Sequence, residues 1–304
     1  MGFEKIITAN YGDDTLTIVE GKYPFKTSTV SLKELTFKDK KILRDRIGPM
    51  DLTMDKSGNL LVINSYDDTL FYIDLANNQI LHIVELGRCP VEIKLYEDNI
   101  YIINCDSNSI SLIDSKTLDI IENIPVGNKP TSIEVDEFDD KIYITNEGGN
   151  SISTLDSSGK IGYIKLKDKP LKLKIEDNTI FILALLNNGS FNCSRIYALD
   201  RKKYKNLWSL DFKGVFFDFI KIGEDAFYLT NPEDGYLYEL NIKNKLVEKK
   251  IYLGGLPSNI ISHNKKEIYI NDLLNNKIII VDILEDMVKH KIRVGKEPYG
   301  ILLL

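Results

Sequence analysis

The sequence predicts an all-β protein, a seven-bladed β-propeller built from four-stranded blades. Three observations lead to this prediction. A strand–turn–strand pattern recurs along nearly the whole chain, its period is about 40 residues, and the two chain ends complement each other as parts of one blade. A chain of 304 residues is long enough for one large all-β domain, and we expect residues 1–304 to form a single propeller domain.

The strand–turn–strand pattern is clearest in residues 141–156, KIYITNEGGNSISTLD. Strand-forming residues lie on both sides of EGGN, which cannot continue a strand. Related copies are LLVINSYDDTLFYID, IYIINCDSNSISLID, YLTNPEDGYLYELN and IYINDLLNNKIIIVD.

Three markers recur with this pattern. An Asn or Asp ends the first strand, an acidic or amide residue follows ten positions later, and a Gly-x-x-Pro-like connector leads into the next unit. Asn and Asp bond nearby backbone N–H groups in turns, while Gly and Pro set special backbone angles. We therefore interpret the markers as blade architecture. The clearest connectors begin at Gly87, Gly127, Gly254 and Gly295.

Each unit contains four strand signals, named a to d from the innermost outward. In the clearest unit they cover residues 131–135, 141–146, 151–156 and 161–166. Blade 1 is predicted from residues 1–48 plus 297–304, and blades 2–7 from residues 49–296. We expect an insertion at 21–40 to precede an outer strand near 42–47, and a lengthened b–c loop at 186–194 in an irregular blade 5.

The chain ends predict how the ring closes. The first unit lacks a strand a before Lys5, and the C-terminal VGKEPYGILLL is a strand a with nothing after it. We expect residues 299–304 to become the innermost strand of blade 1, which leaves no open edge. A right-handed parallel β-helix is the structural alternative, but its repeats are usually shorter. A WD40-like propeller shares the period, but its Gly-His and Trp-Asp signature is absent.

The YITN of blade 4, its variants YIIN, LVIN and YLTN, the NSI-type strands, the ID endings and the VGxxP connectors resemble the YVTN β-propeller repeat family. The resemblance covers nearly the whole chain and is most specific in blades 2–4 and 7. It implies a seven-bladed propeller of the kind found in prokaryotic surface-layer and related proteins, with interaction roles. The family has no universal catalytic motif, so the resemblance implies no active-site residues.

Composition narrows the classes of partner. The net charge of −6, with both signs interspersed, argues against a nucleic-acid partner. No apolar run reaches membrane-spanning length, and MGFEKIITAN lacks the features of a signal peptide. We expect a monomeric cytoplasmic protein without membrane insertion. The abundance of Ile, Lys and Asn suggests an AT-rich bacterial genome.

The innermost strands predict a polar central channel. Residues two and four places after each connector proline share one side of strand a, and the intervening apolar residues suit packing between blades. Mutual ion pairing is the simpler interpretation of these channel side chains; the functional one is a pore that binds an ion, water or a small ligand. The candidates are Asp51, Glu92, Lys94, Glu134, Lys172, Lys174, Asp218 and Asn259.

A second candidate surface is the loop face, defined as the end of the ring that carries the b–c loops and the d–a connectors. Acidic pairs in the loops and basic residues on the connectors give a mixed surface suited to partner recognition. The candidates are Asp67, Asp68, Arg88, Lys129, Phe191, Glu233, Asp234 and Lys296. No loop matches a calcium-binding motif, so we expect no metal site.

Cys89 and Cys105 should lie close together on the loop face, because they flank strands a and b of blade 3. A disulfide or redox pair is one interpretation; two reduced thiols suit a cytoplasmic protein better. The three histidines do not converge, which argues against a zinc site or a catalytic triad. We expect no cofactor.

Three functional hypotheses follow. The first is a non-enzymatic scaffold that binds a protein or peptide through the loop face. The second is a channel-centred hydrolase or lyase that uses carboxylates such as Asp51, Glu92 and Asp218. The third is a surface or spore-associated structural protein.

Overall fold

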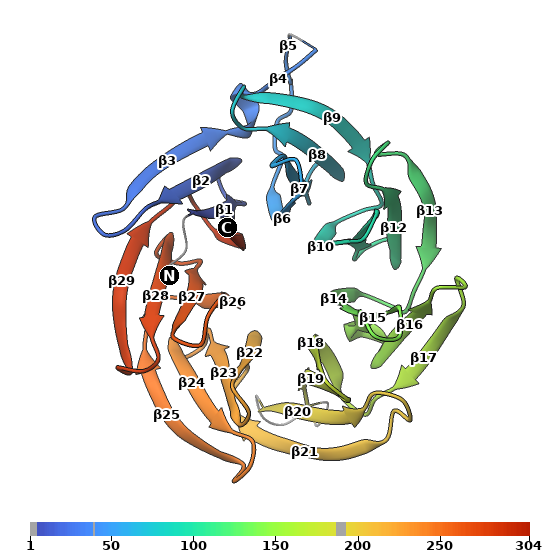
Figure 1. Ribbon diagram of the computed structural model, residues 1–304, viewed down its shortest axis with the longest axis vertical. Coiled ribbons are helices and arrows are strands. Elements are labelled where there is room, and N and C mark those ends of the chain that lie inside the picture. Colours follow the sequence, from blue (N-terminus) through green and yellow to red (C-terminus); the bar gives the residue numbers. More distant parts are fainter. Residues whose placement is uncertain (1–4, 39, 187–192) are drawn as a thin grey trace.

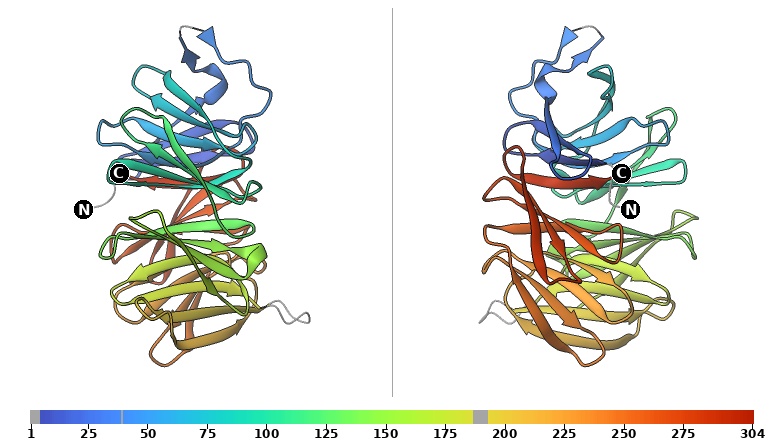
Figure 2. Two further views of the ribbon diagram at one scale, coloured as in Figure 1. Left: turned by 90° about the vertical axis from the view of Figure 1, so that its right-hand side faces the viewer. Right: turned by 60° about the vertical axis from the view of Figure 1, so that its left-hand side comes forward.

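The computed structural model describes residues 5–38, 40–186 and 193–304, and it confirms the seven-bladed, all-β propeller (Figure 1). The blades are arranged radially in a ring in Figure 1, and Figure 2 shows the same ring from two sides. The described residues contain only two short 3-10 helices, η1 (Leu32–Glu34) and η2 (Glu147–Gly149). Among these residues, no helix has the length and apolar character needed to cross a lipid bilayer.

Blades 3 to 7 are four-stranded antiparallel sheets whose strands follow chain order from the channel outward. Blade 3 contains β10 (Pro90–Tyr96), β11 (Asn99–Asn104), β12 (Ser109–Asp114) and β13 (Ile120–Pro125). Blade 4 contains β14 (Pro130–Asp136), β15 (Lys141–Asn146), β16 (Ser151–Asp156) and β17 (Ile161–Lys165). Blade 5 contains β18 (Lys169–Glu176), β19 (Thr179–Leu185), β20 (Cys193–Asp200) and β21 (Asn206–Lys213). Blade 6 contains β22 (Asp218–Ile222), β23 (Ala226–Asn231), β24 (Tyr236–Asn241) and β25 (Leu246–Tyr252). Blade 7 contains β26 (Pro257–Ile261), β27 (Glu267–Asp272), β28 (Lys277–Asp282) and β29 (Met287–Arg293).

Blade 1 combines the two ends of the chain, as the sequence predicts. Its strands, from the channel outward, are β30 (Pro298–Leu303), β1 (Lys5–Asn10), β2 (Thr15–Glu20) and β3 (Lys26–Ser31). β30 pairs antiparallel with β1, with Ile7 opposite Leu302. The C-terminal strand therefore closes the ring.

The expected outer strand of blade 1 near residues 42–47 is wrong. The outer strand is β3, which lies inside the segment that the sequence analysis assigned to an insertion. Four of its six residues are exposed and its sequence, KTSTVS, is polar, so it lacks the apolar alternation of the inner strands. Instead, Ile47 is fully buried and Ile42 packs against the core between blades 1 and 2.

Blade 2 has six strands because two short strands extend its outer edge. Its sheet order is β5 (Lys40–Lys41), β4 (Thr36–Phe37), β9 (Gln79–Glu85), β8 (Thr69–Asp74), β7 (Leu60–Asn64) and β6 (Pro49–Met54). β4 pairs parallel with β9, so the segment after β3 covers an edge that would otherwise be free.

The hydrophobic core lies mainly between neighbouring blades rather than at one centre. Leu61 and Ile63 of blade 2, for example, pack with Ile93 and Ile102 of blade 3. Each blade thus buries its two apolar faces only when both neighbours are present.

The repeated sequence markers form one local unit. Asn146 Nδ2 donates to the hydroxyls of Ser151 at 3.2 Å and Ser153 at 2.9 Å on the next strand. A Cβ atom at Gly127, in the connector, would lie 2.5 Å from the Asn146 side chain. The connector glycine and the strand-ending Asn therefore recur together because the amide occupies the space beside the glycine.

Candidate functional site

A β-bulge at the start of most innermost strands shapes the channel wall. Register shifts follow Pro49, Pro90, Pro130 and Pro170, so two successive residues oppose one residue of strand b. In blade 3 both Val91 and Glu92 therefore line the channel. The sequence analysis selected only the second and fourth residues after each proline, because it assumed uninterrupted alternation.

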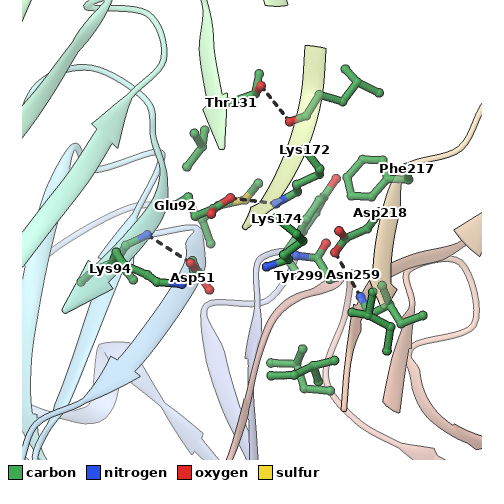
Figure 3. A pocket seen from close by; sticks show the side chains of 18 of the residues that line it. Asp51, Glu92, Lys94, Thr131, Lys172, Lys174, Phe217, Asp218, Asn259 and Tyr299 are labelled. Atoms are coloured by element: carbon green, nitrogen blue, oxygen red, sulfur yellow. Dashed lines mark hydrogen bonds and ion pairs between the residues drawn. The ribbon is translucent and has the colours of Figure 1, made fainter. Parts of the chain in front are cut away.

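The channel encloses a cavity of about 790 Å³ (Figure 3). Near the loop face, the wall forms an apolar collar. Each collar residue comes one position before a channel-facing residue in the sequence. The collar residues are Met50, Val91, Leu171, Phe217 and Tyr299. The cavity reaches the loop face, because Cys105 and Glu147 of the b–c loops also line it.

Below the collar lies a ring of charged and polar side chains. Seven of the eight predicted channel residues line the cavity: Asp51, Glu92, Lys94, Lys172, Lys174, Asp218 and Asn259. The eighth, Glu134, bonds to two of the lysines. The structure thus brings the predicted channel set together; whether it binds a ligand stays a prediction.

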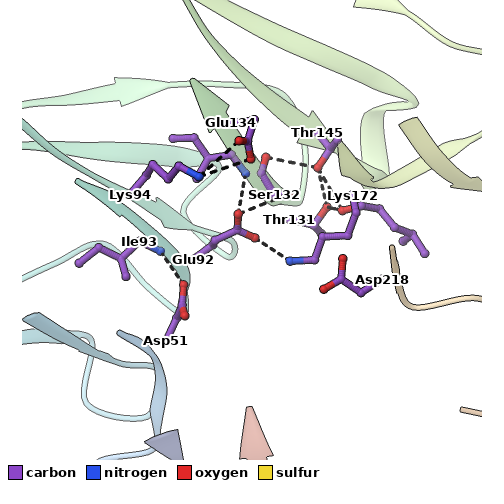
Figure 4. A network of polar contacts seen from close by, with 12 residues as sticks. Asp51, Glu92, Ile93, Lys94, Thr131, Ser132, Glu134, Thr145, Lys172 and Asp218 are labelled. Carbon is purple, nitrogen blue, oxygen red and sulfur yellow. Dashed lines mark hydrogen bonds and ion pairs between the residues drawn. The ribbon is translucent and has the colours of Figure 1, made fainter. Parts of the chain in front are cut away.

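One half of this ring, from blades 3 to 5, is internally ion-paired (Figure 4). Lys172 Nζ lies 2.7 Å from Glu92 Oε2, and Lys94 and Lys174 each lie 3.4 Å from a carboxylate oxygen of Glu134. Burial, the largest single effect, would raise the pKa of Glu92. The charge and hydrogen bond of Lys172, the charge of Lys174 and the Ile133 N–H group together outweigh burial and hold that pKa below its usual value. Glu92 is therefore ionised and engaged at neutral pH.

The other half of the ring contains two carboxylates, Asp51 and Asp218, that form no ion pair with any described residue. Each accepts a backbone N–H group from the next blade: Asp51 from Ile93 at 3.1 Å and Asp218 from Ile260 at 3.2 Å. Burial, with a smaller contribution from the charge of Glu92, raises the pKa of Asp51 to about 7. Burial also raises the pKa of Asp218, although Lys172 and Lys174 oppose the change.

The b–c loops of the loop face repeat a different device. Asp68 adopts a left-handed backbone with φ of 54°, and its Oδ1 accepts the backbone N–H of Cys89 at 2.7 Å. Asn108 does the same for Lys129 at 2.8 Å. Asp and Asn tolerate this conformation better than most residues. Asp68 is therefore a turn-forming residue that joins two adjacent loops.

The structure separates the other loop-face candidates by their contacts. Asp67 is held by Arg44 at 2.6 Å, and Asp234 accepts the hydroxyl of Tyr238. Glu233 accepts the backbone N–H of Val215 at 3.3 Å. The basic side chains at the connectors are exposed: Arg88, Lys129 and Lys296. Phe191 lies outside the described residues.

The sequence analysis missed a cluster of aromatic and basic residues on the loop face, the Tyr–Arg cluster, defined as Tyr11, Tyr66 and Arg46. The tyrosine rings stack with centroids 4.7 Å apart, and the Arg46 guanidinium lies 3.7 Å from the Tyr66 ring centroid. Tyr299 of the apolar collar contacts Tyr11 edge-on at 5.5 Å. The sequence signal is a tyrosine one or two residues after the strand-ending Asn in blades 1 and 2.

Cys89 and Cys105 lie on adjacent segments, and the Cys105 N–H donates to the Cys89 carbonyl at 2.9 Å. Both are free thiols in the structure. Burial raises the pKa of both, that of Cys105 to about 11, so each thiol is a weak nucleophile at neutral pH.

The described residues offer no group of three or more His, Cys, Asp or Glu side chains arranged for a metal ion. His82 and His290 lie on the outer strands β9 and β29, and His263 follows β26. No histidine is among the described residues that line the cavity.

Fold and cavity together define the class of protein: a seven-bladed β-propeller with a charged central channel. No family model and no curated protein matches the chain. Solved structures do match it. A protein from Lactobacillus plantarum is 11% identical, with a TM-score of 0.78 and 100% of each chain covered.

Two solved propellers whose names state an enzymatic activity are also similar to this chain. Hydrazine synthase from Kuenenia stuttgartiensis is 17% identical, with a TM-score of 0.75 and with 86% of this chain and 91% of that chain covered. A virginiamycin B lyase from Staphylococcus aureus, crystallised with quinupristin, is 16% identical, with a TM-score of 0.70 and coverage of 86% and 94%. At these identities the similarity shows the fold.

Proposed function

We propose that this protein is a non-enzymatic interaction scaffold that binds a protein or peptide partner through its loop face. The Tyr–Arg cluster carries the proposal. Tyr66 is 45% exposed although its ring stacks on Tyr11 and contacts the Arg46 guanidinium, so the ring is both accessible and held in place. Tyrosine and arginine dominate the binding energy of protein interfaces, and a fixed side chain loses little entropy on binding.

The segment that supplies Arg46 is anchored to the ring on both sides. Lys33 pairs with Asp14 of blade 1 at 2.8 Å, and Arg44 pairs with Asp67 of blade 2 at 2.6 Å. Leu43, between these anchors, is 97% exposed. An exposed apolar residue on an anchored segment beside a Tyr–Arg cluster is the composition expected of a preorganised binding surface.

Charge around the cluster supports selective recognition. The exposed cations Arg88, Lys129 and Lys296 lie on connectors around the same face, and the anions Glu233 and Asp234 lie in a b–c loop. Such mixed charge directs orientation and discriminates between partners more than it adds affinity.

The channel-centred hydrolase or lyase is less well supported. The lysines of the ring pair with Glu92 and Glu134, and each of the carboxylates Asp51, Glu92 and Asp218 accepts a backbone N–H group of the following blade. These contacts give the carboxylates a role in joining blades. No histidine accompanies them among the described lining residues.

Affinity purification from native cells, followed by binding measurements with the purified partner, tests the scaffold proposal. Tyr66→Ala and Arg46→Ala should each weaken binding at least tenfold. The matched control is Tyr163→Ala, which removes a tyrosine that is 58% exposed on the outer strand β17. Equal binding by Tyr66→Ala and Tyr163→Ala would contradict the proposal.

We also propose that the repeat is of the YVTN type and that the protein acts as a cytoplasmic monomer. The sequence motifs support the first statement. Cell fractionation and size-exclusion chromatography test the second; recovery in the cell-surface or spore fraction would favour a structural protein of the cell envelope or spore.

A further inference from the structure

We propose that the channel cavity is a binding site for the primary ammonium group of a small organic cation. This inference goes beyond the loop-face scaffold and does not depend on it. The site lies below the apolar collar, in the half of the ring formed by blades 6, 7, 1 and 2.

The distribution of charge is the first argument. Four carboxylates and three lysines belong to the ring, and all three lysines bond to Glu92 or Glu134. Asp51 and Asp218 form no ion pair with any described residue; the charges of Lys172 and Lys174 still act on Asp218, which is only 6% exposed. Buried carboxylates are normally paired, and a bound cation would supply the missing charge.

The second argument is the excess of hydrogen-bond acceptors in the same half. Asn259 Oδ1 is buried and accepts no hydrogen bond from any residue that the structure describes. It comes from the blade next to Asp218, and both side chains point into the cavity beside Tyr299 (Figure 3). Buried acceptors usually have donors, and a primary ammonium group offers three N–H donors.

The third argument is the shape and chemistry of the wall. The cavity has a volume of about 790 Å³, within the usual range for small-ligand sites. Ile220, Ile261 and Leu302 form an apolar wall below Asp218 and Asn259, while Phe217 and Tyr299 place aromatic rings above them. Aromatic rings attract ammonium groups, and the apolar wall suits an alkyl chain. The ligand class is therefore an aliphatic amine or diamine.

The test compares three four-carbon probes by isothermal titration calorimetry on the intact protein. Butane-1,4-diamine is a dication, 4-aminobutanoate a zwitterion and butanedioate a dianion. We expect saturable binding of the diamine that weakens as salt is added, and at least tenfold weaker binding of the other two probes. No saturable binding of the diamine, or binding of butanedioate with equal affinity, would overturn the proposal.

Isosteric variants locate the site. Asp218→Asn and Asp51→Asn should each weaken binding of the diamine at least tenfold. The control, Asp98→Asn, changes an exposed carboxylate that pairs with Lys116 outside the cavity and should bind as the parent does. Undiminished binding by both cavity variants would overturn the assignment. If a variant does not fold, the relative affinities of the parent protein for the three probes still test the proposal.

Discussion

At the scale of single residues, the environment of each buried charge determines what its removal should do. Arg201 and Asp136 form an ion pair that is buried on both sides, whereas Lys116 and Asp98 pair in solvent. Asp51 is half-buried and forms no ion pair with any described residue. These three cases give different expectations for stability.

Asp51 should make the protein less stable as the pH rises. Its pKa is raised from 3.8 to about 7 by burial, so between these values the folded protein holds a proton that the unfolded chain has lost. The free energy of unfolding therefore decreases across this range, by at most about 1.4 kcal/mol for each pKa unit. Asp51→Asn removes the decrease and retains an acceptor for the Ile93 N–H group. We expect the variant to melt several degrees above the parent at pH 8 and at nearly the same temperature at pH 4, where little of the decrease has yet occurred because the pH is close to the pKa of Asp51 in the unfolded chain. If the difference in melting temperature between the variant and the parent is the same at both pH values, this expectation is wrong.

Arg201 should contribute far more to the free energy of unfolding than an exposed basic residue that forms a similar ion pair. Its guanidinium lies 2.8 Å from Asp136, which joins the β20–β21 turn of blade 5 to β14 of blade 4. Arg201→Met leaves a buried carboxylate without its partner, a change that costs about 3–5 kcal/mol. The control Lys116→Met breaks a 2.6 Å pair that is exposed on both sides and should not change stability measurably. Urea denaturation midpoints would compare them, and similar midpoints for the two variants would contradict the expectation.

At the scale of elements, two segments that lie outside the regular repeat hold the ring together. β30 joins the last blade to the first, and residues 32–47 fill the space between blades 1 and 2. Both supply contacts that no neighbouring repeat could replace.

Deleting residues 298–304 should lower thermal stability severely. β30 pairs with β1, and the Thr8 hydroxyl donates to the Gly300 carbonyl at 2.8 Å. The deletion removes the innermost strand of blade 1 and leaves β1 as an open edge. A milder variant tests the packing of β30 against β6 of blade 2, because a Cβ at Gly300 would lie 2.8 Å from Asp51 Cα. We expect Gly300→Ala to melt below the parent and the deletion far lower. A deletion variant that melts within a few degrees of the parent would rule out this closure.

The segment between β3 and β6 should behave as core. Leu35 is 1% exposed and packs between blades 1 and 2, so Leu35→Ala should cost about 2–5 kcal/mol. Leu43, eight residues later, is 97% exposed and provides the matched control: Leu43→Ala should leave the melting temperature unchanged. If both variants melt like the parent, the segment is a surface loop.

At the scale of the whole molecule, the repeat explains why so much of the fold could be predicted. Asn146, Gly127 and their equivalents make contacts within and between blades, so the motif that marks each unit in the sequence also builds it. Alternation along strand a placed Glu92 and Lys172 in the channel correctly.

The features that sequence could not predict arise where chain segments depart from the repeat. The apolar collar depends on the β-bulges, which change which residues face the channel. β3 is polar and exposed, so its pattern resembles that of a loop. The Tyr–Arg cluster joins Tyr11, Arg46 and Tyr66, which the ring brings together from three segments.

Hydrogen–deuterium exchange with and without the purified partner tests the proposal that the loop face is the binding surface of this propeller. We expect slower exchange on binding in the loops at residues 11–14 and 65–68 and in residues 42–48, with no change in the opposite-face turn at residues 75–78. Protection of the opposite-face turns without protection of these loops would contradict the proposal.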